Sequence, residues 1–194
     1  MKTLMLSLTV LVAAAITPIS AQTSYDEEIA PAPMVVAQPL PFSDNDYSDL
    51  TSNELVTRMG VAARASRQLA LIARGRAESP EVRAYAERVL ADQSASDAQL
   101  ASLAKGTRST LPTALDLANQ QTVDRLMFLL GPDFDREYLK FSGDAYSEQI
   151  TLLQAASQLK DPIAAEFANT RLLTAIAYRD AALNSTATAQ SGEE

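Results

Sequence analysis

Apolar side chains recur every three or four residues along most of the chain after residue 51, the spacing that places side chains on one face of an α-helix. Residues that start and stop helices divide this region into segments near 52–75, 80–104, 114–130, 133–158 and 162–183. No stretch alternates apolar and polar residues as a half-buried strand would. The pattern therefore predicts an all-α protein with five helices.

Capping residues support these boundaries. Thr51 and Glu54 have the spacing of a capping box, in which each side chain accepts from an unpaired amide of the first turn. Two other helices are expected to begin at an acceptor followed by proline, Ser79–Pro80 and Asp161–Pro162. Three glycines fall where left-handed helix ends are expected: Gly75, Gly106 and Gly131.

The apolar stripes of the long helices become polar near their middles. The first stripe carries Ser66 at this level, the second Gln93 and the fourth Glu148, and Tyr178 occupies the corresponding part of the last helix. We predict that these four side chains form a central polar layer. One interpretation is that they hydrogen-bond one another and fix the register of the helices, because buried polar groups must be paired. The other is a ligand pocket in which Glu148 accepts a proton and Tyr178 donates one.

The order of the segments also suggests a topology. Ser79–Pro80 is followed by Tyr85–Ala86, and Asp161–Pro162 is followed at the same spacing by Phe167–Ala168. This weak internal echo indicates two helical hairpins joined by a crossover that contains the short third helix.

The first residues are typical of a signal peptide. A basic Lys2 precedes a nearly unbroken apolar stretch over residues 4–16, and Ala21 closes a short run of small residues. The stretch is much shorter than the roughly 20 residues needed to span a bilayer. We expect cleavage after Ala21 and a mature chain that is periplasmic or secreted, without a transmembrane segment.

Charge separates the tails from the folded region. The chain carries a formal net charge of −8, and residues 22–54 contain seven acidic side chains and no basic one. Four prolines add to this composition, so residues 22–50 are predicted to be a disordered tether and residues 184–194 a disordered tail around a folded domain at 51–183. Acidic and basic side chains balance within 55–183, which disfavours binding to nucleic acid.

Cysteine, histidine and tryptophan are absent from the whole sequence. This composition excludes disulfides, thiol catalysis, zinc fingers and triads that need histidine. A lone inward carboxylate at Glu148, with neither a nucleophile nor a second acid, defines no reaction class. The sequence therefore favours a protein that is not an enzyme and needs no cofactor.

Several motifs in order resemble the bacterial family catalogued as domain of unknown function 4142. They are Ser79–Val82, Ala91–Asp92, Thr110–Asp116, Leu126–Gly131 and Lys160–Pro162 with Phe167–Ala168. The resemblance covers roughly residues 51–183 and implies an exported, ferritin-like four-helix bundle with an extra short crossover helix. Members are often labelled membrane or outer-membrane proteins, and the family label records no activity.

The chain departs from that family at the positions that could bind metal. Where members commonly carry histidine, this sequence has Gln93, Ala145 and Tyr178. A ferritin-like di-metal site needs carboxylates and histidines from four helices. The sequence therefore favours a non-enzymatic interaction or envelope-stress module with a protein or small-molecule partner. A metal-dependent redox protein is the first alternative, and a small-ligand binder, which requires a cavity in the central polar layer, is the second.

Overall fold

The computed structural model describes residues 47–191, with side chains as far as residue 185. All of these residues belong to one compact unit, Pro39–Glu194. The predicted signal peptide, residues 22–46 of the predicted tether and residues 192–194 lie outside the described part. The helices are α1 (Ser52–Arg76), α2 (Pro80–Thr107), α3 (Leu117–Met127), α4 (Gly131–Ala156) and α5 (Pro162–Ser191). Residues 47–191 contain no strand, so the all-α prediction is confirmed.

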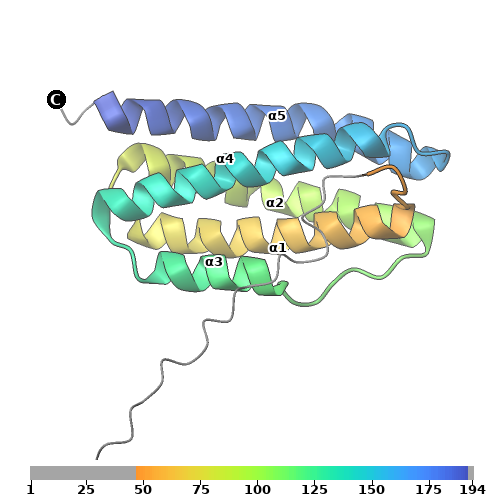
Figure 1. The fold of residues 1–194 in the computed structure, drawn as a ribbon, viewed down its shortest axis with the longest axis horizontal. Helices are drawn as coiled ribbons and strands as arrows, with labels where there is room; N and C mark the ends of the chain where they lie inside the picture. The colour runs from red at the N-terminus through yellow and green to blue at the C-terminus, as the bar shows by residue number, and fades with distance from the viewer. Residues whose placement is uncertain (1–46, 192–194) are drawn as a thin grey trace, which may run out of the picture. The chain divides into compact units, whose positions relative to one another are not determined.

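The four long helices form two hairpins. Helix α1 packs along α2, and α4 packs along α5, while the pairs meet through α1 with α4 and α2 with α5 (Figure 1). The short α3 lies in the connection between the hairpins and contacts α1 and α4. The predicted four-helix bundle with an extra crossover helix is therefore confirmed. Within residues 47–191, none of the helices combines the length and the apolar character needed to cross a membrane.

The helix starts follow the predicted capping chemistry. Thr51 Oγ1 accepts from the Glu54 amide at 3.2 Å, and Asp161 Oδ1 accepts from the Ile163 amide at 3.0 Å. Ser79 Oγ accepts from two amides of α2 at 3.2 and 3.4 Å. The Glu54 carboxylate pairs with Arg58 at 2.7 Å, one turn further along, so the structure shows the Thr51 half of the expected capping box.

The three glycines do not end helices as predicted. Gly75 and Gly106 lie inside α1 and α2, and Gly131, with φ +58°, begins α4. Tertiary contacts explain the difference. Arg76 extends α1 by donating to the carbonyls of Met127 and Leu129 at 2.8 and 3.1 Å. A side chain at Gly106 would meet Ile163 Cγ2 at 3.0 Å, so its absence makes room for the first turn of α5.

The folded region is longer than predicted at both ends. Leu50 is 8% exposed and packs into the core, and the Tyr47 ring lies 5.2 Å from the Arg58 guanidinium carbon, so residues 47–50 belong to the domain. Helix α5 continues to Ser191, eight residues beyond the predicted end at 183. No glycine or proline interrupts the sequence before Gly192, so nothing local stops the helix.

A buried carboxylate joins the two hairpins. Asp135, in the first turns of α4, is 4% exposed and accepts from the amides of Glu78 and Ser79 at 3.1 and 2.7 Å. These amides lie in the turn between α1 and α2 and have no helical partner of their own. One side chain of the second hairpin therefore satisfies the turn of the first, as charge-assisted hydrogen bonds to amides do.

The apolar core is divided into two clusters along the bundle. One surrounds Leu55, Leu103 and Leu153, and the other surrounds Leu69, Val82 and Leu139. Tyr178 packs against both. The apolar ends of the α1 and α2 stripes lie in these two clusters. The polar middles of the same stripes, at Ser66 and Gln93, lie between the clusters.

A pair of glycine variants in α1 tests the packing of the crossover. A Cβ at Gly60 would meet Pro112 Cδ at 2.5 Å, whereas a Cβ at Gly75 meets nothing within 4 Å. Gly75→Ala should raise the free energy of unfolding by up to about 1 kcal/mol through helix propensity. Gly60→Ala should lower it, because the rigid proline ring must move. Thermal unfolding compares them, and an equal gain for both would mean that the 108–116 segment does not pack against Gly60.

Candidate functional site

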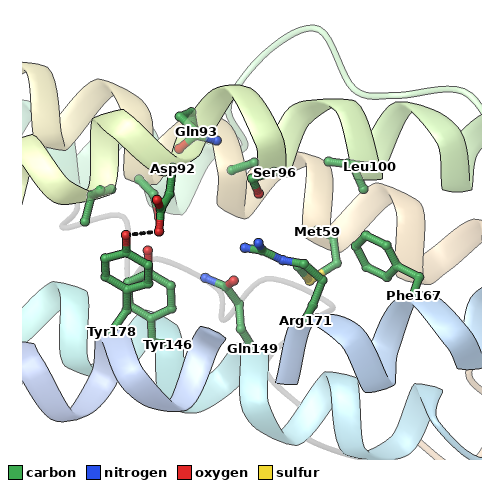
Figure 2. A pocket seen from close by; sticks show the side chains of 13 residues that line it. Met59, Asp92, Gln93, Ser96, Leu100, Tyr146, Gln149, Phe167, Arg171 and Tyr178 are labelled. Carbon is green, nitrogen blue, oxygen red and sulfur yellow. Dashed lines mark hydrogen bonds between the residues drawn. The ribbon is translucent and has the colours of Figure 1, made fainter. Parts of the chain in front are cut away.

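A small pocket lies in the middle of the bundle, between the two apolar clusters. The volume that the centre of a water molecule can occupy inside it is about 20 Å³. All four long helices line it with polar side chains: Ser66 from α1; Asp92, Gln93 and Ser96 from α2; Tyr146 and Gln149 from α4; Arg171 and Tyr178 from α5. We call this the central pocket (Figure 2).

The structure brings together three of the four residues of the predicted central polar layer. Ser66, Gln93 and Tyr178 all line the central pocket. Glu148 does not, because its side chain is exposed and faces a separate groove between α1, α4 and the start of α3. Its neighbour Gln149 is 8% exposed and takes the inward position. The prediction that Glu148 is the buried acid of this layer is therefore wrong.

The error has a clear cause in the register of α4. Its inward face runs through Tyr138, Ser142, Tyr146, Gln149 and Leu153. The predicted stripe also began at Tyr138 but then followed the apolar Phe141 and Ala145, which led to Glu148. Tyr146, Gln149 and Leu153 are themselves spaced at three and four residues, so the correct face was visible to an analysis that allowed polar side chains inside the bundle.

Tyr178 links α5 to α2. Its hydroxyl hydrogen-bonds the Asp92 carboxylate and lies 3.0 Å from the Arg88 carbonyl oxygen (Figure 2). Burial raises the pKa of Tyr178, and the hydrogen bond to Asp92 raises it further. The phenol therefore stays protonated at neutral pH and acts as a donor to Asp92.

The phenol rings form one wall of the central pocket. Tyr146 and Tyr178 stack with centroids 5.3 Å apart, and Tyr85 meets Tyr178 edge-on at 6.3 Å. Burial raises the pKa of Tyr146 to about 12, although the positive Arg171 and the nearby Ser66 hydroxyl oppose that shift. Each of these rings is held by neighbours on a second helix, so the wall is rigid.

A polar chain on the α1 side orients Gln93. Its Nε2 donates to Asp97 Oδ1 at 3.1 Å, and Asp97 also pairs with Arg67 of α1. Gln93 is 7% exposed. Because Asp97 accepts one N–H of this amide, the second N–H and the carbonyl oxygen are left for other contacts.

Arg171, like Gln149, is a residue of the site that was not predicted from the sequence. Within residues 47–185, its guanidinium makes neither a hydrogen bond nor an ion pair, and it extends from α5 toward the middle of the pocket (Figure 2). Burial lowers the pKa of Arg171, while the nearby Tyr146, Asp92 and Tyr178 raise it. Arginine remains charged at neutral pH. The central pocket thus contains a half-buried cation that feels the nearby charge of Asp92 but forms no direct ion pair with any described residue.

Gln149 faces the same space with a free amide. It is buried, and its side chain makes no hydrogen bond to any residue of the described region. Its amide atoms are not among the fully buried side-chain atoms that lack a hydrogen-bond partner, so they reach the open space of the pocket. Arg171 and Gln149 therefore present unmet donors to one small cavity.

The donor set of the central pocket does not fit a ferritin-like metal centre. Such a centre needs several carboxylates and imidazoles that converge on one point. Here Asp92 is the single carboxylate that lines the pocket, and Arg171 places a positive charge in it. No group of three metal-binding side chains occurs within the described residues.

A double-mutant cycle tests the link between α5 and α2. Tyr178→Phe keeps the ring stack but removes the donor, and Asp92→Ala removes the acceptor. Each change should lower the free energy of unfolding, with a coupling of about 1 kcal/mol because the acceptor is charged but exposed. Chemical denaturation of the four proteins gives this number. Additive effects would show that the hydrogen bond contributes nothing to stability.

Comparison of the sequence with known proteins identifies one matching family. A model of the domain of unknown function DUF4142 matches residues 38–184. Neither the curated proteins nor the solved structures include a match. The matched range spans all of α1 to α4 and most of α5, and it includes every residue that lines the central pocket. The chain therefore belongs to the DUF4142 family.

Proposed function

We propose that this protein is an exported, non-enzymatic protein of the bacterial envelope that binds a small polar molecule in the central pocket. One observation carries the proposal: the Arg171 guanidinium and the Gln149 amide face a cavity without protein partners. Buried polar groups are normally paired within a fold. Groups left open to a cavity between four helices are suited to a ligand, and helical bundles commonly build their binding sites there.

The cavity distinguishes this function from a pure interaction module. Polar residues that served only to fix helix register would hydrogen-bond one another and leave no space. Tyr178 and Asp92 do so. Arg171 and Gln149 do not, which favours the small-ligand binder among the hypotheses drawn from the sequence.

The ionisation of the site supports binding without catalysis. A general base needs a pKa near the working pH. Burial holds the pKa of Tyr146 at about 12 and raises that of Tyr178. Asp92 accepts from Tyr178, and Arg171 can only donate. These groups supply hydrogen bonds and charge to a ligand, and neither phenol is poised to take a proton from it.

Ligand binding can be tested on side-chain amide signals by nuclear magnetic resonance. Mature protein labelled with ¹⁵N would be titrated with small organic acids, amines, alcohols and amides. A ligand of the central pocket should shift the Gln149 and Gln93 amides in a saturable way. Gln154, exposed on the same helix as Gln149, is the matched control and should not move. If no compound moves Gln149 or Gln93 before Gln154, the central pocket is not a binding site.

The same preparation tests the metal-dependent alternative. Protein purified from its native compartment without a chelator should contain no stoichiometric transition metal, because the central pocket offers a single carboxylate beside a cation. Elemental analysis measures this. One or two tightly held iron or manganese ions per chain would replace the ligand-binding proposal with a redox function.

Export is tested by the mass of the mature chain. If residues 1–21 are a signal peptide, protein recovered from the periplasm or the medium should begin at Gln22. Intact-mass spectrometry gives the answer. Recovery of the uncleaved chain from the cytosol would contradict the envelope location and leave the ligand site untouched.

A further inference from the structure

We infer that the ligand of the central pocket is a small organic acid, and that Arg171 holds its carboxylate. The inference rests on the proposed function and specifies its ligand class. Its basis is the placement of one cation and several hydrogen-bond donors around a cavity in which the cation makes no direct ion pair or hydrogen bond to any described residue.

The donors match a carboxylate in kind. A guanidinium presents parallel N–H groups in a plane, and a carboxylate accepts two of them at once. The Gln149 amide supplies further N–H groups at the same cavity, and Ser96 of α2 adds a hydroxyl. A carboxylate only accepts, so it can use all of these donors. A cationic ligand would be repelled by Arg171.

Asp92 is the one carboxylate of the central pocket that could form an ion pair with Arg171, but it is hydrogen-bonded to Tyr178 instead. Its Oδ2 is hydrogen-bonded by the Tyr178 hydroxyl, and no ion pair joins it to Arg171. Tyr178 is in turn fixed by the stack on Tyr146. The guanidinium is therefore left open to a ligand while Asp92 still lowers the net charge of the surroundings.

The size and opening of the pocket limit the ligand. A space of about 20 Å³ for the centre of a water molecule is little more than one water needs, so it limits the ligand to a head group of a few atoms and excludes a ring or a nucleotide. Asp92 of α2 is exposed and Arg171 of α5 is half-buried, so the pocket meets solvent beside these two side chains. The carboxylate would lie inside, and any short substituent would point toward this opening.

The decisive experiment compares formate with formamide, which has nearly the same shape and no charge. The full mature chain would be titrated with each at constant ionic strength, with sodium chloride as the ionic control, while the Arg171 Nε–H signal and the Gln149 amide are followed. Formate should bind saturably, with formamide and chloride each weaker by about tenfold or more, because a charge-assisted bidentate contact is lost.

Variants at two arginines of α5 test whether Arg171 is the residue that binds formate. Arg171→Gln should abolish the formate-induced shift of Gln149, and Arg171→Lys should weaken formate by about tenfold because the charge remains but the planar fork is lost. Arg179→Gln is the matched control. It removes the same charge from the same helix, but Arg179 pairs with Asp180 and does not line the central pocket. This variant should bind formate as the parent does.

The outcomes separate this inference from the proposed function. If formamide or another neutral compound binds as well as formate, the pocket is a ligand site but not a carboxylate site. If chloride competes equally with formate, the site recognises charge alone and the carboxylate assignment is wrong. If Arg179→Gln weakens formate as much as Arg171→Gln does, the effect is one of overall charge, and Arg171 does not hold the ligand.

Discussion

The Arg171 guanidinium lies half-buried in the middle of a helical bundle, between two apolar clusters, without a direct ion pair to any described residue. Desolvating a charge is costly unless the charge is paired, and the lowered pKa of Arg171 is a sign of that cost. The rest of the site can be understood from this constraint. Tyr178 engages the nearest carboxylate, Gln149 offers a second unmet donor, and the cavity between them can admit the missing partner.

The two apolar clusters allow the bundle to tolerate this central layer. Each cluster joins residues from the four long helices on its own side of the pocket, so most of the buried apolar surface lies away from the central layer. Polar contacts between the hairpins fix their register. Asp135 of α4 satisfies the turn between α1 and α2, and Asp161 before α5 accepts from Ser52 of α1 at 2.8 Å. The pocket is thus held on rigid elements, which a preorganised binding site requires.

Much of the fold could be predicted because its signals are local. Capping side chains and helical periodicity placed all five helices, and the internal echo of Ser79–Pro80 and Asp161–Pro162 led to the two hairpins. The errors at helix ends arise where distant contacts decide. Helix α1 ends at Arg76, one residue after Gly75, and Arg76 donates to the carbonyls of Met127, the last residue of α3, and Leu129. No local sequence pattern predicts that contact.

The site was predicted in part for the same reason. Ser66 and Gln93 are polar positions within apolar stripes, so sequence alone could place them inside. Gln149 was missed because Glu148 fitted a stripe built from Phe141 and Ala145, and the two interpretations differ by one residue of rotation. Arg171 carried no signal at all, because an arginine on a long helix is ordinarily exposed. Its burial follows only from how α5 packs on α2 and α4.

The central claim is that Arg171 binds a ligand and lowers the stability of the folded chain when that ligand is absent. Arg171→Met replaces the guanidinium with an apolar side chain that can fill the same space, and Arg179→Met is the matched change outside the pocket. In buffer free of carboxylates, the claim predicts that the melting temperature rises by about 2–4 °C for Arg171→Met and is nearly unchanged for Arg179→Met. A clear fall in the melting temperature of Arg171→Met alone would show that Arg171 stabilises the folded chain, and would contradict the claim.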